Sequence, residues 1–572
     1  MQRKHVVIVG AGPCGLVALK ELREAGHTAV ALEKGPGIGG VFCRTHDTQY
    51  ENLYLTISNM LMAYSDFPPE DLRLKYSSKD EYGAYLEAYA DAFGLRPHVR
   101  TDTEVVRASL VDGRWRIVAR TGGGAPEEIE ADALVVATGS NHVPRVPDLP
   151  GFTGEVLHSS EYRCAADFAG KRVLVVGSGE SAFDIGADIA GVAAKTTLWA
   201  RTPITPAPRF AVLIAAERDH DEIEVMKNEA KWSRLKVSDF LESMTVSRMA
   251  NAAPMWAYST IRHAIWAALR LANPVSERLS AWNRQAVAPD LLLGDQLTVP
   301  TKSARLCTAA ARGNIDVVVA AEASFSARRA SFAGVTYEGH GPALRPAPRE
   351  AAVDDLDVVV LCTGYRTDFS WLDVPGLDWN PRTWFKHCFP AGLGDRLMFL
   401  GWARPHQGGI PACAEILARY IAMVLAGDRA LPGDYAERAL AEGRAEHDFY
   451  KHARHQVNLV DYPAFMDSVA RLIGCTPAVP PLSSPERLAQ YWLYPNWPIW
   501  YRKDGPGARS ELVERVLSTF PLRTSFGLNP FNLMALGFSA LQAPVEALWS
   551  PRPGLDRRWA FKAKKHLLHD ST

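Results

Sequence analysis

The chain has 572 residues, 47% hydrophobic and 22% charged, and its 63 basic and 64 acidic residues leave a net charge of -1. This is the composition of a globular protein with material for large cores, and its length predicts two to four domains. The even charge balance argues against a nucleic-acid partner.

The first 33 residues predict a dinucleotide site. A β-branched run at 6–9 has the composition of a strand buried on both faces. The turn GAGPCG (10–15), a helical stretch and a second strand ending in Glu33 follow. Such glycines let the backbone approach a pyrophosphate, the helix N-terminus faces its charge, and the acid accepts from a ribose hydroxyl. The pattern favours FAD.

The same arrangement returns at 172–201. The turn GSGESA (177–182) follows a strand, and the next strand ends in Arg201 where the first unit has an acid. An arginine there suits the 2'-phosphate of NADPH. Two dinucleotide sites imply electron transfer between two cofactors, as in flavoprotein disulfide reductases and monooxygenases. The eight cysteines form no CxxC pair, which disfavours a disulfide reductase and indicates reduced thiols in a cytoplasmic protein.

The remaining patterns complete an α/β fold with two Rossmann-like dinucleotide-binding domains. Residues 103–120 predict a hairpin with a turn at Asp112-Gly113, and the strands at 131–140 and 357–369 each run into a Thr-Gly turn. A helical insertion and a mainly helical C-terminal extension are expected. The expected domains are 1–155, the first part of the FAD-binding domain; 156–345, the NADPH-binding domain with the insertion at about 207–290; 346–450, the second part of the FAD-binding domain; and 451–572, the extension.

The stretch FTGEVLHSSEY (152–162) lies just before the second glycine turn. Its Phe152, Gly154, His158 and Tyr162 match FxGxxxHxxx(Y/F), so the chain resembles the flavin-containing monooxygenase family, whose identifying sequence this is. The resemblance covers most of the chain. It extends to GGVF at 39–42, with Phe42 replacing Trp, and to YSDFP at 64–68 and LCTGY at 361–365; DYPAFMDSVARLIG at 461–474 and YRKDGPGAR at 501–509 resemble animal-type members.

The resemblance implies a cycle in which NADPH reduces FAD and O2 then forms a C4a-hydroperoxide. A soft nucleophile, an amine nitrogen or sulfur, takes one oxygen atom and the other leaves in water. N-hydroxylation or N-oxidation of an amine, which includes amino-acid-like substrates, or S-oxidation of a thioether is therefore expected. Baeyer–Villiger oxygenation of a ketone stays open, although Tyr162 in place of Trp disfavours it. An uncoupled NADPH oxidase is the third alternative.

The resemblance also implies the site residues. The family usually has an Asn near the reactive flavin atom, where this chain has Thr56; Asn59 is the alternative, and Asp66 belongs to the same segment. His158 is expected to be structural or a contact of the nucleotide domain, and no metal site is expected. The expected cofactor-binding residues are Gly10, Gly12, Pro13, Cys14, Gly15, Glu33, Lys34, Gly40, Val41, Phe42, Thr138, Gly139, Gly177, Ser178, Gly179, Glu180, Ser181, Arg201, Thr202, Thr363, Gly364 and Tyr365.

The sequence indicates least about the substrate and the partners of the protein. Arg262, Arg270 and Arg284 in the insertion either orient a carboxylate-bearing substrate or form solvated helix faces. The apolar stretch 531–549 is too polar to span a membrane, which leaves peripheral membrane contact open. A homo-oligomer is likewise open.

Overall fold

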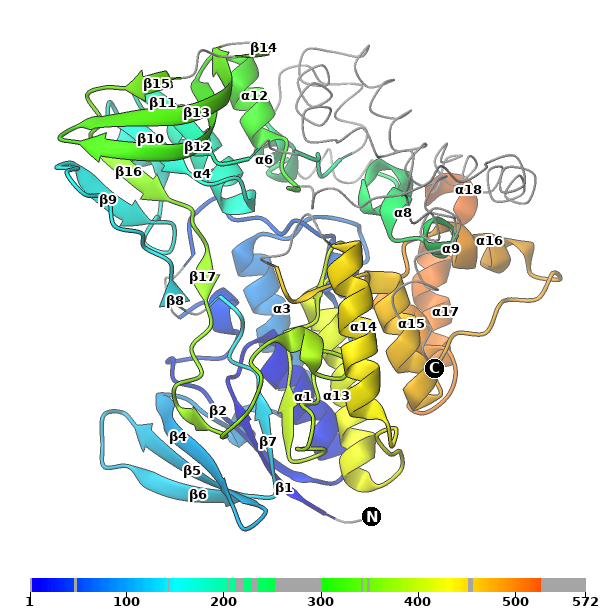
Figure 1. Ribbon diagram of the computed structural model, residues 1–572. Coiled ribbons are helices and arrows are strands. Elements are labelled where there is room, and N and C mark those ends of the chain that lie inside the picture. The colour runs from blue at the N-terminus through cyan, green and yellow to red at the C-terminus, as the bar shows by residue number, and fades with distance from the viewer. Residues whose placement is uncertain are drawn as a thin grey trace, which may run out of the picture.

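The structure is a computed structural model that describes residues 3–45, 49–141, 143–202, 206–210, 221–228, 235–252, 301–340, 343–346, 350–450 and 456–525. Figure 1 shows two lobes, each built around a sheet. The ribbon of β8 (Val143–Pro144) and β17 (Tyr365–Arg366) connects the lobes. A group of helices lies beside the lobe that contains the N-terminal strand. The expected α/β fold with two Rossmann-like domains is confirmed.

The first sheet has the order β19-β7-β1-β2-β3, and all of its pairings are parallel. The predicted β-branched run forms the central strand, whose residues are buried because both faces of the sheet are covered. Helices α1 and α13 pack on one face and the sheet containing β4 and β5 on the other. The bounds are β1 (His5–Val9), β2 (Thr28–Leu32), β3 (Val99–Arg100), β7 (Ala133–Val136), β19 (Leu397–Phe399), α1 (Pro13–Glu24) and α13 (Ile410–Ala426).

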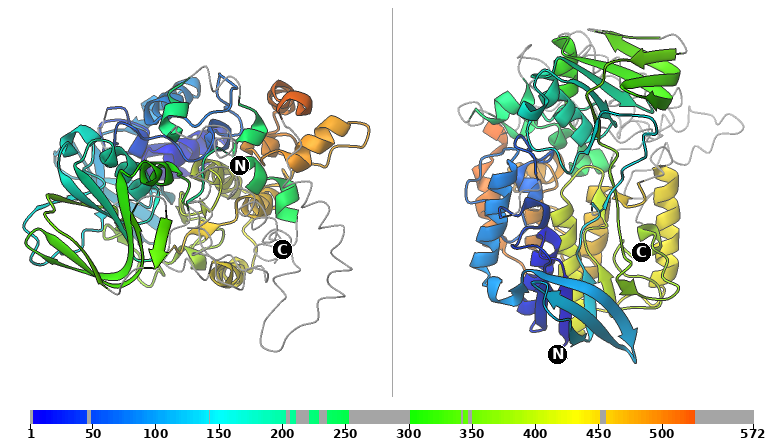
Figure 2. Two further views of the ribbon diagram at one scale, coloured as in Figure 1. Left: turned by 90° about the horizontal axis from the view of Figure 1, so that it is seen from above. Right: turned by 90° about the vertical axis from the view of Figure 1, so that its left-hand side faces the viewer.

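The predicted hairpin is confirmed and covers the first sheet. β4 (Thr103–Val111) pairs antiparallel with β5 (Arg114–Thr121). The turn residues Asp112 and Gly113 adopt φ of 52° and 81°, the left-handed region that Asp and Gly tolerate. β6 (Glu127–Ala131) and β18 (Leu372–Asp373) complete this sheet, which is visible at the foot of the molecule in Figure 2, right.

The second sheet begins with five parallel strands in the order β12-β11-β10-β16-β9 and continues antiparallel through β13, β14 and β15. Because β16 pairs with both β10 and β9, this sheet extends past the boundary expected at 345; the division into domains otherwise stays a prediction. The bounds are β9 (Glu155–His158), β10 (Arg172–Val176), β11 (Lys195–Ala200), β12 (Ile315–Ser326), β13 (Arg329–His340), β14 (Ala343–Pro346), β15 (Glu350–Val353) and β16 (Val358–Leu361).

Helices make up most of the remaining regular structure of the described chain. α4 (Glu180–Ala190) and α12 (Arg305–Ala311) pack on the second sheet. The other helices are α2 (Asn59–Met62), α3 (Lys79–Ala92), α6 (Glu222–Met226), α8 (Glu242–Thr245), α9 (Arg248–Ala252), α14 (Tyr435–Phe449), α15 (Tyr462–Ile473), α16 (Pro485–Leu493), α17 (Ser510–Thr519) and α18 (Leu522–Ser525). Short 3-10 turns are η1 (Gly40–Phe42), η2 (Arg96–His98), η3 (Ala165–Phe168), η4 (Val237–Asp239), η6 (Pro381–Thr383) and η8 (Pro498–Arg502), and the short strands are β20 (Arg404–Pro405) and β21 (Leu459–Val460).

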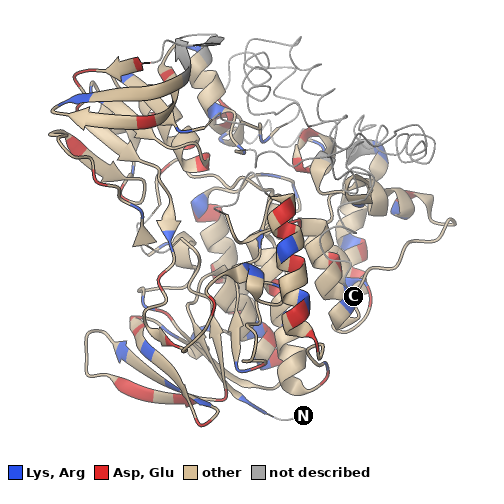
Figure 3. Ribbon diagram, in the orientation of Figure 1, with Lys and Arg blue, Asp and Glu red and all other residues tan. Residues whose placement is uncertain are grey.

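Two sequence expectations fall partly or wholly outside the described residues. Most of the 207–290 insertion is not described, and this includes Arg262, Arg270 and Arg284. The stretch 531–549 also lies outside. Among the described helices, none combines the length and the hydropathy that a bilayer crossing requires. Basic and acidic residues are interspersed over the described elements, as α14 illustrates in Figure 3, and all eight cysteines are free.

Candidate active site between two dinucleotide turns

The first glycine turn lies at the carboxyl end of β1, where the chain enters α1. Gly10 has a φ of 103°, and a Cβ there would lie 2.6 Å from the Ala137 carbonyl oxygen. A Cβ on Gly15 would overlap the Gly10 carbonyl oxygen. At Gly12 the nearest atom to a Cβ is the Gly40 Cα at 3.5 Å, an ordinary contact. The outer two glycines therefore hold the turn together, whereas Gly12 keeps open the space in front of the helix N-terminus.

Residues far apart in the predicted FAD set meet at this edge of the sheet. The Glu33 carboxylate accepts hydrogen bonds from the amides of Ala11 and Gly35, both at 2.8 Å. Gly39 donates to the Ala11 carbonyl at 2.9 Å, which brings the 39–42 turn to the first turn. Among the described residues, the buried Thr138 hydroxyl finds no hydrogen-bond partner. An open helix N-terminus beside an unpaired hydroxyl fits the pyrophosphate and ribityl chain of FAD.

The second glycine turn repeats this geometry between β10 and α4. Gly177 has a φ of 141°, and a Cβ there would lie 2.5 Å from the Cys362 carbonyl oxygen. No described atom lies within 4 Å of a Cβ on Gly179, the residue that caps the N-terminus of α4. Arg201 follows β11 directly and is exposed. The turn therefore has room for a second pyrophosphate, and Arg201 is placed to reach a ribose phosphate beside it.

Replacing Arg201 with Ala is expected to raise the KM for NADPH by about 10- to 100-fold, the value of one charge-assisted hydrogen bond, and to leave that for NADH unchanged. Steady-state oxidation of both nucleotides measures this. Arg329→Ala is the matched control, because Arg329 is an exposed arginine of the same sheet that pairs with Asp354 at 2.8 Å. An equal rise in the KM values for NADPH and NADH would show that Arg201 does not bind the 2'-phosphate.

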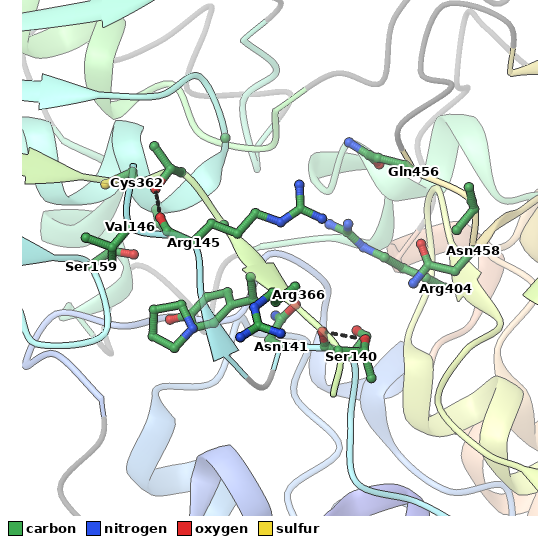
Figure 4. Close-up of a pocket in the computed structure, with 18 of the residues that line it drawn as sticks. Ser140, Asn141, Arg145, Val146, Ser159, Cys362, Arg366, Arg404, Gln456 and Asn458 are labelled. Atoms are coloured by element: carbon green, nitrogen blue, oxygen red, sulfur yellow. Dashed lines mark hydrogen bonds between the residues drawn. The ribbon is translucent and has the colours of Figure 1, made fainter. Parts of the chain in front are cut away.

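A cleft of about 2410 Å³ separates the two lobes. Of the predicted residues, it brings together the second glycine turn, Arg201, Thr202 and the 363–365 turn. Its opposite wall contains a group of aromatic rings: Phe369 stacks on Trp379 with ring centroids 4.7 Å apart and lies 5.6 Å from Trp402. Figure 4 shows polar side chains, among them Arg145, Arg366 and Arg404, entering the cleft. The arrangement can hold a nucleotide against one wall and an aromatic molecule against the other.

The three residues expected near the reaction have different surroundings, and none lines the cleft. The Asn59 amide is occupied: its Nδ2 donates to the Arg73 carbonyl at 2.9 Å, and its Oδ1 accepts from the Met60 and Lys75 amides. Thr56 is half-buried, and its hydroxyl makes no hydrogen bond within the described chain. Asn59 therefore holds its own loop in shape, and its amide is already engaged in that role.

Asp66 belongs to a buried set of charges, the Arg502 cluster, which comprises Lys20, Glu21, Asp66, Glu415 and Arg502. The Arg502 Nη2 lies 2.6 Å from Glu21, 3.0 Å from Glu415 and 3.2 Å from Asp66, and Lys20 contacts Asp66 and lies 3.0 Å from Glu21. Burial raises the pKa of Asp66, but Arg502 and Lys20 outweigh it and hold that pKa below its ordinary value. The geometry gives Asp66 a role in joining α1 to the C-terminal extension.

The identifying stretch 152–162 acts through packing. A Cβ on Gly154 would lie 2.6 Å from the Phe152 ring and 2.7 Å from the Asp357 carbonyl oxygen. His158 is buried: its Nδ1 lies 2.9 Å from Ser160 Oγ and its Nε2 lies 3.2 Å from the Gly364 carbonyl oxygen. Burial lowers the pKa of His158, so the ring is neutral at physiological pH. His158 thus fixes the 363–365 turn beside the cleft, in agreement with the structural role expected for it.

The structure adds groups that the motifs did not indicate. The loop that carries Thr56 is tied to the insertion, because the Ser58 amide donates to Glu242 at 3.0 Å. The buried Lys302 amine has no hydrogen-bond partner in the part of the chain that the structure describes; burial lowers its pKa, against the opposing charges of Glu242 and Glu180. Arg145, Arg366 and Arg404, which also line the cleft, were missed as well. They lie in no glycine turn or family motif, and their only signal was an unexplained arginine directly after TGY, at 366.

Comparison with known proteins agrees with this geometry. The flavin-binding monooxygenase-like family matches residues 3–204 and 349–525. The 4-hydroxybenzoate brominase (decarboxylating) of Marinomonas mediterranea is 32% identical over 91% of this chain and 93% of its own length. A protein of the same name from Pseudoalteromonas luteoviolacea is 31% identical over 91% and 93%. The S-allyl-L-cysteine S-oxygenase of Allium sativum shares the fold, with a TM-score of 0.56 and 21% identity over 91% of this chain and 99% of its own.

Proposed function

The chain belongs to the flavin-binding monooxygenase-like family and is an FAD-dependent NADPH monooxygenase; from this we propose that its soft nucleophile is bromide and that it brominates a hydroxyaryl carboxylate with loss of CO2. The observation that carries the proposal is the match to two decarboxylating 4-hydroxybenzoate brominases over nine-tenths of the chain. Bromide is a polarisable nucleophile, as a thioether is, but it differs from the amine nitrogen or sulfur that the sequence led us to expect.

The proposed reaction balances in two stages. FAD, when bound and reduced by NADPH, supplies an electrophilic oxygen atom derived from O2. The first stage is NADPH + O2 + Br⁻ + 2H⁺ → NADP⁺ + HOBr + H2O. In the second, HOBr + ArCO2⁻ → ArBr + CO2 + OH⁻: a carbon–bromine bond forms at the ring carbon whose bond to the carboxylate breaks.

The chain's own residues bind, orient and exclude water. The glycine turns hold the two nucleotides, and the aromatic wall of the cleft shields the reacting partners from solvent. Neither bromide nor an unprotonated amine needs a base before it attacks oxygen. The neutral, fully engaged His158 is consistent with a reaction that needs no general base there. We propose Thr56, with its unengaged hydroxyl, as the residue of its loop that contacts the cofactors.

N- or S-oxygenation is the second candidate. The 152–162 stretch and its closing Tyr162 favour it, since they match the amine- and sulfur-oxidising branch of the family. The same oxygen-transfer step serves both candidates, and they differ in which nucleophile the cleft admits. Ketone oxygenation and uncoupled oxidase activity have no comparable support in the cleft.

The holoenzyme with NADPH, O2, bromide and 4-hydroxybenzoate is expected to release CO2 and a brominated phenol, which mass spectrometry identifies by the bromine isotope pair. Product should depend on bromide and match most of the NADPH consumed. Hydrogen peroxide equal to NADPH consumption would instead identify an oxidase. Oxygenation of an amine or thioether panel, with bromide without effect, would select the second candidate.

A further inference from the structure

The cleft contains a concentration of positive charge that the dinucleotide sites do not account for. Among its described lining residues are five arginines but two carboxylates. Asp373 is taken by Arg107 at 2.6 Å, and Glu180 lies at the N-terminus of α4. Within the described chain, the guanidinium groups of Arg145, Arg366 and Arg404 make no hydrogen bond or ion pair. With Arg201 facing the expected NADPH phosphate, three cations remain for another anion.

Two of these arginines approach each other from opposite walls. Arg145 follows β8 in the ribbon between the lobes, and its main chain is fixed on both sides: its amide donates to the Gly364 carbonyl at 2.9 Å, and its carbonyl accepts from the Thr363 hydroxyl. Arg404 opens β20 and is held by its amide, which donates to the Asn458 carbonyl at 2.9 Å. Figure 4 shows the two side chains extending toward one another across the cleft. Two guanidinium groups that converge without an acidic partner form a binding site for an anion.

The position of Arg404 places this anion-binding site at the end of the cleft nearer the first sheet, where FAD is expected. β19 ends at Phe399, five positions before Arg404, and runs parallel to β1 and β7. Their carboxyl ends therefore share the edge at which a dinucleotide binds. The aromatic wall adjoins it: Trp402 is two residues away, and Trp379 is 39% exposed. An anionic group on an aromatic ring would meet both features at once.

We infer that Arg404 and Arg145 form a carboxylate clamp that selects aromatic acids as substrates and orients the ring against Trp379 and Trp402. This inference rests on the proposed function and supplies the specificity that it leaves open. Each guanidinium presents paired donors that match a carboxylate, whereas bromide needs no such fork. The clamp thus recognises the organic substrate, whereas Arg201, a different arginine of the cleft, binds the nucleotide.

Direct binding tests the clamp without turnover. Isothermal titration of FAD-loaded enzyme with 4-hydroxybenzoate and with phenol is expected to show tighter binding of the acid. Arg404→Gln should weaken the binding of the acid by about 10- to 100-fold, because one charge-assisted contact is lost, and should leave the affinity for phenol unchanged. Arg404→Lys should recover part of the loss. Arg107→Gln is the matched control, a cleft arginine already paired with Asp373, and should change neither affinity.

The nucleotide provides the opposing outcome. If Arg404→Gln raises the KM for NADPH and leaves the acid's affinity unchanged, these arginines hold cofactor phosphates and the clamp does not exist. Equal weakening of acid and phenol would likewise overturn it, because that pattern is a general loss of cleft shape. Because binding is measured without bromide or NADPH, a wild-type enzyme that binds the acid but produces no brominated phenol refutes the proposed reaction alone.

Discussion

Gly12→Val is expected to give a folded protein that purifies without FAD. Gly12 has a φ of −71°, which valine adopts readily, and a Cβ there meets nothing closer than 3.5 Å. The branched side chain would enter the space in front of α1 where the pyrophosphate binds. As a poor N-cap residue, valine costs the helix about 1 kcal/mol, too little to unfold a domain of this size. The flavin should be lost while the fold remains.

The ratio of flavin absorbance to protein absorbance, together with circular dichroism, measures the two effects separately. Gly15→Ala is the contrasting variant. Its Cβ would overlap the Gly10 carbonyl oxygen, so the turn itself must distort and native ellipticity should fall with flavin content. A Gly12→Val protein that retains full FAD would place the pyrophosphate elsewhere.

The features that could be predicted from the sequence are those whose contacts are local. Each glycine turn, its helix and the closing Glu33 or Arg201 fall within one strand–helix–strand unit, so the spacing alone contains the geometry. The hairpin at Asp112-Gly113 is local for the same reason. The family match confirms the resemblance to flavin-containing monooxygenases, the fold and the two cofactors that were predicted from the sequence.

The features that escaped prediction depend on distant contacts. Asp66 stands in a family segment, but its partner Arg502 lies 436 positions along the chain, and no pattern near Asp66 announces that ion pair. The Asn59 amide is taken by backbone groups of a neighbouring loop whose path the sequence does not specify. Arg145 and Arg404 face each other only because the two lobes meet. Tertiary contacts decide such positions, and residue type alone cannot.

The second large effect concerns the Arg502 cluster. Arg502→Met is expected to lower stability by about 3–5 kcal/mol, because it leaves Glu21, Asp66 and Glu415 buried with Lys20 as the one remaining cation of the cluster. The Ser65 hydroxyl, which accepts from the Arg502 Nε at 2.8 Å, loses its donor too. The apparent denaturation temperature should fall by about 5 °C. Arg515→Met, an exposed change in the same extension, is the control and should have little effect.

The pH dependence of that loss separates charge from packing. Burial raises the pKa of Glu415, and Arg502 opposes the rise; Arg502 also helps to hold the pKa of Asp66 low. Without Arg502 the folded-state pKa of Asp66 is expected to rise, and that of Glu415, already above its unfolded value, is expected to rise further. Carboxyls with raised pKa destabilise the fold at high pH, and the fold regains stability as the pH falls and they take up protons. The deficit of Arg502→Met relative to wild type should therefore be larger at pH 8 than at pH 5. A deficit that is the same at both would assign the effect to lost packing, and Arg502 would then join the extension to α1 by shape and not by charge.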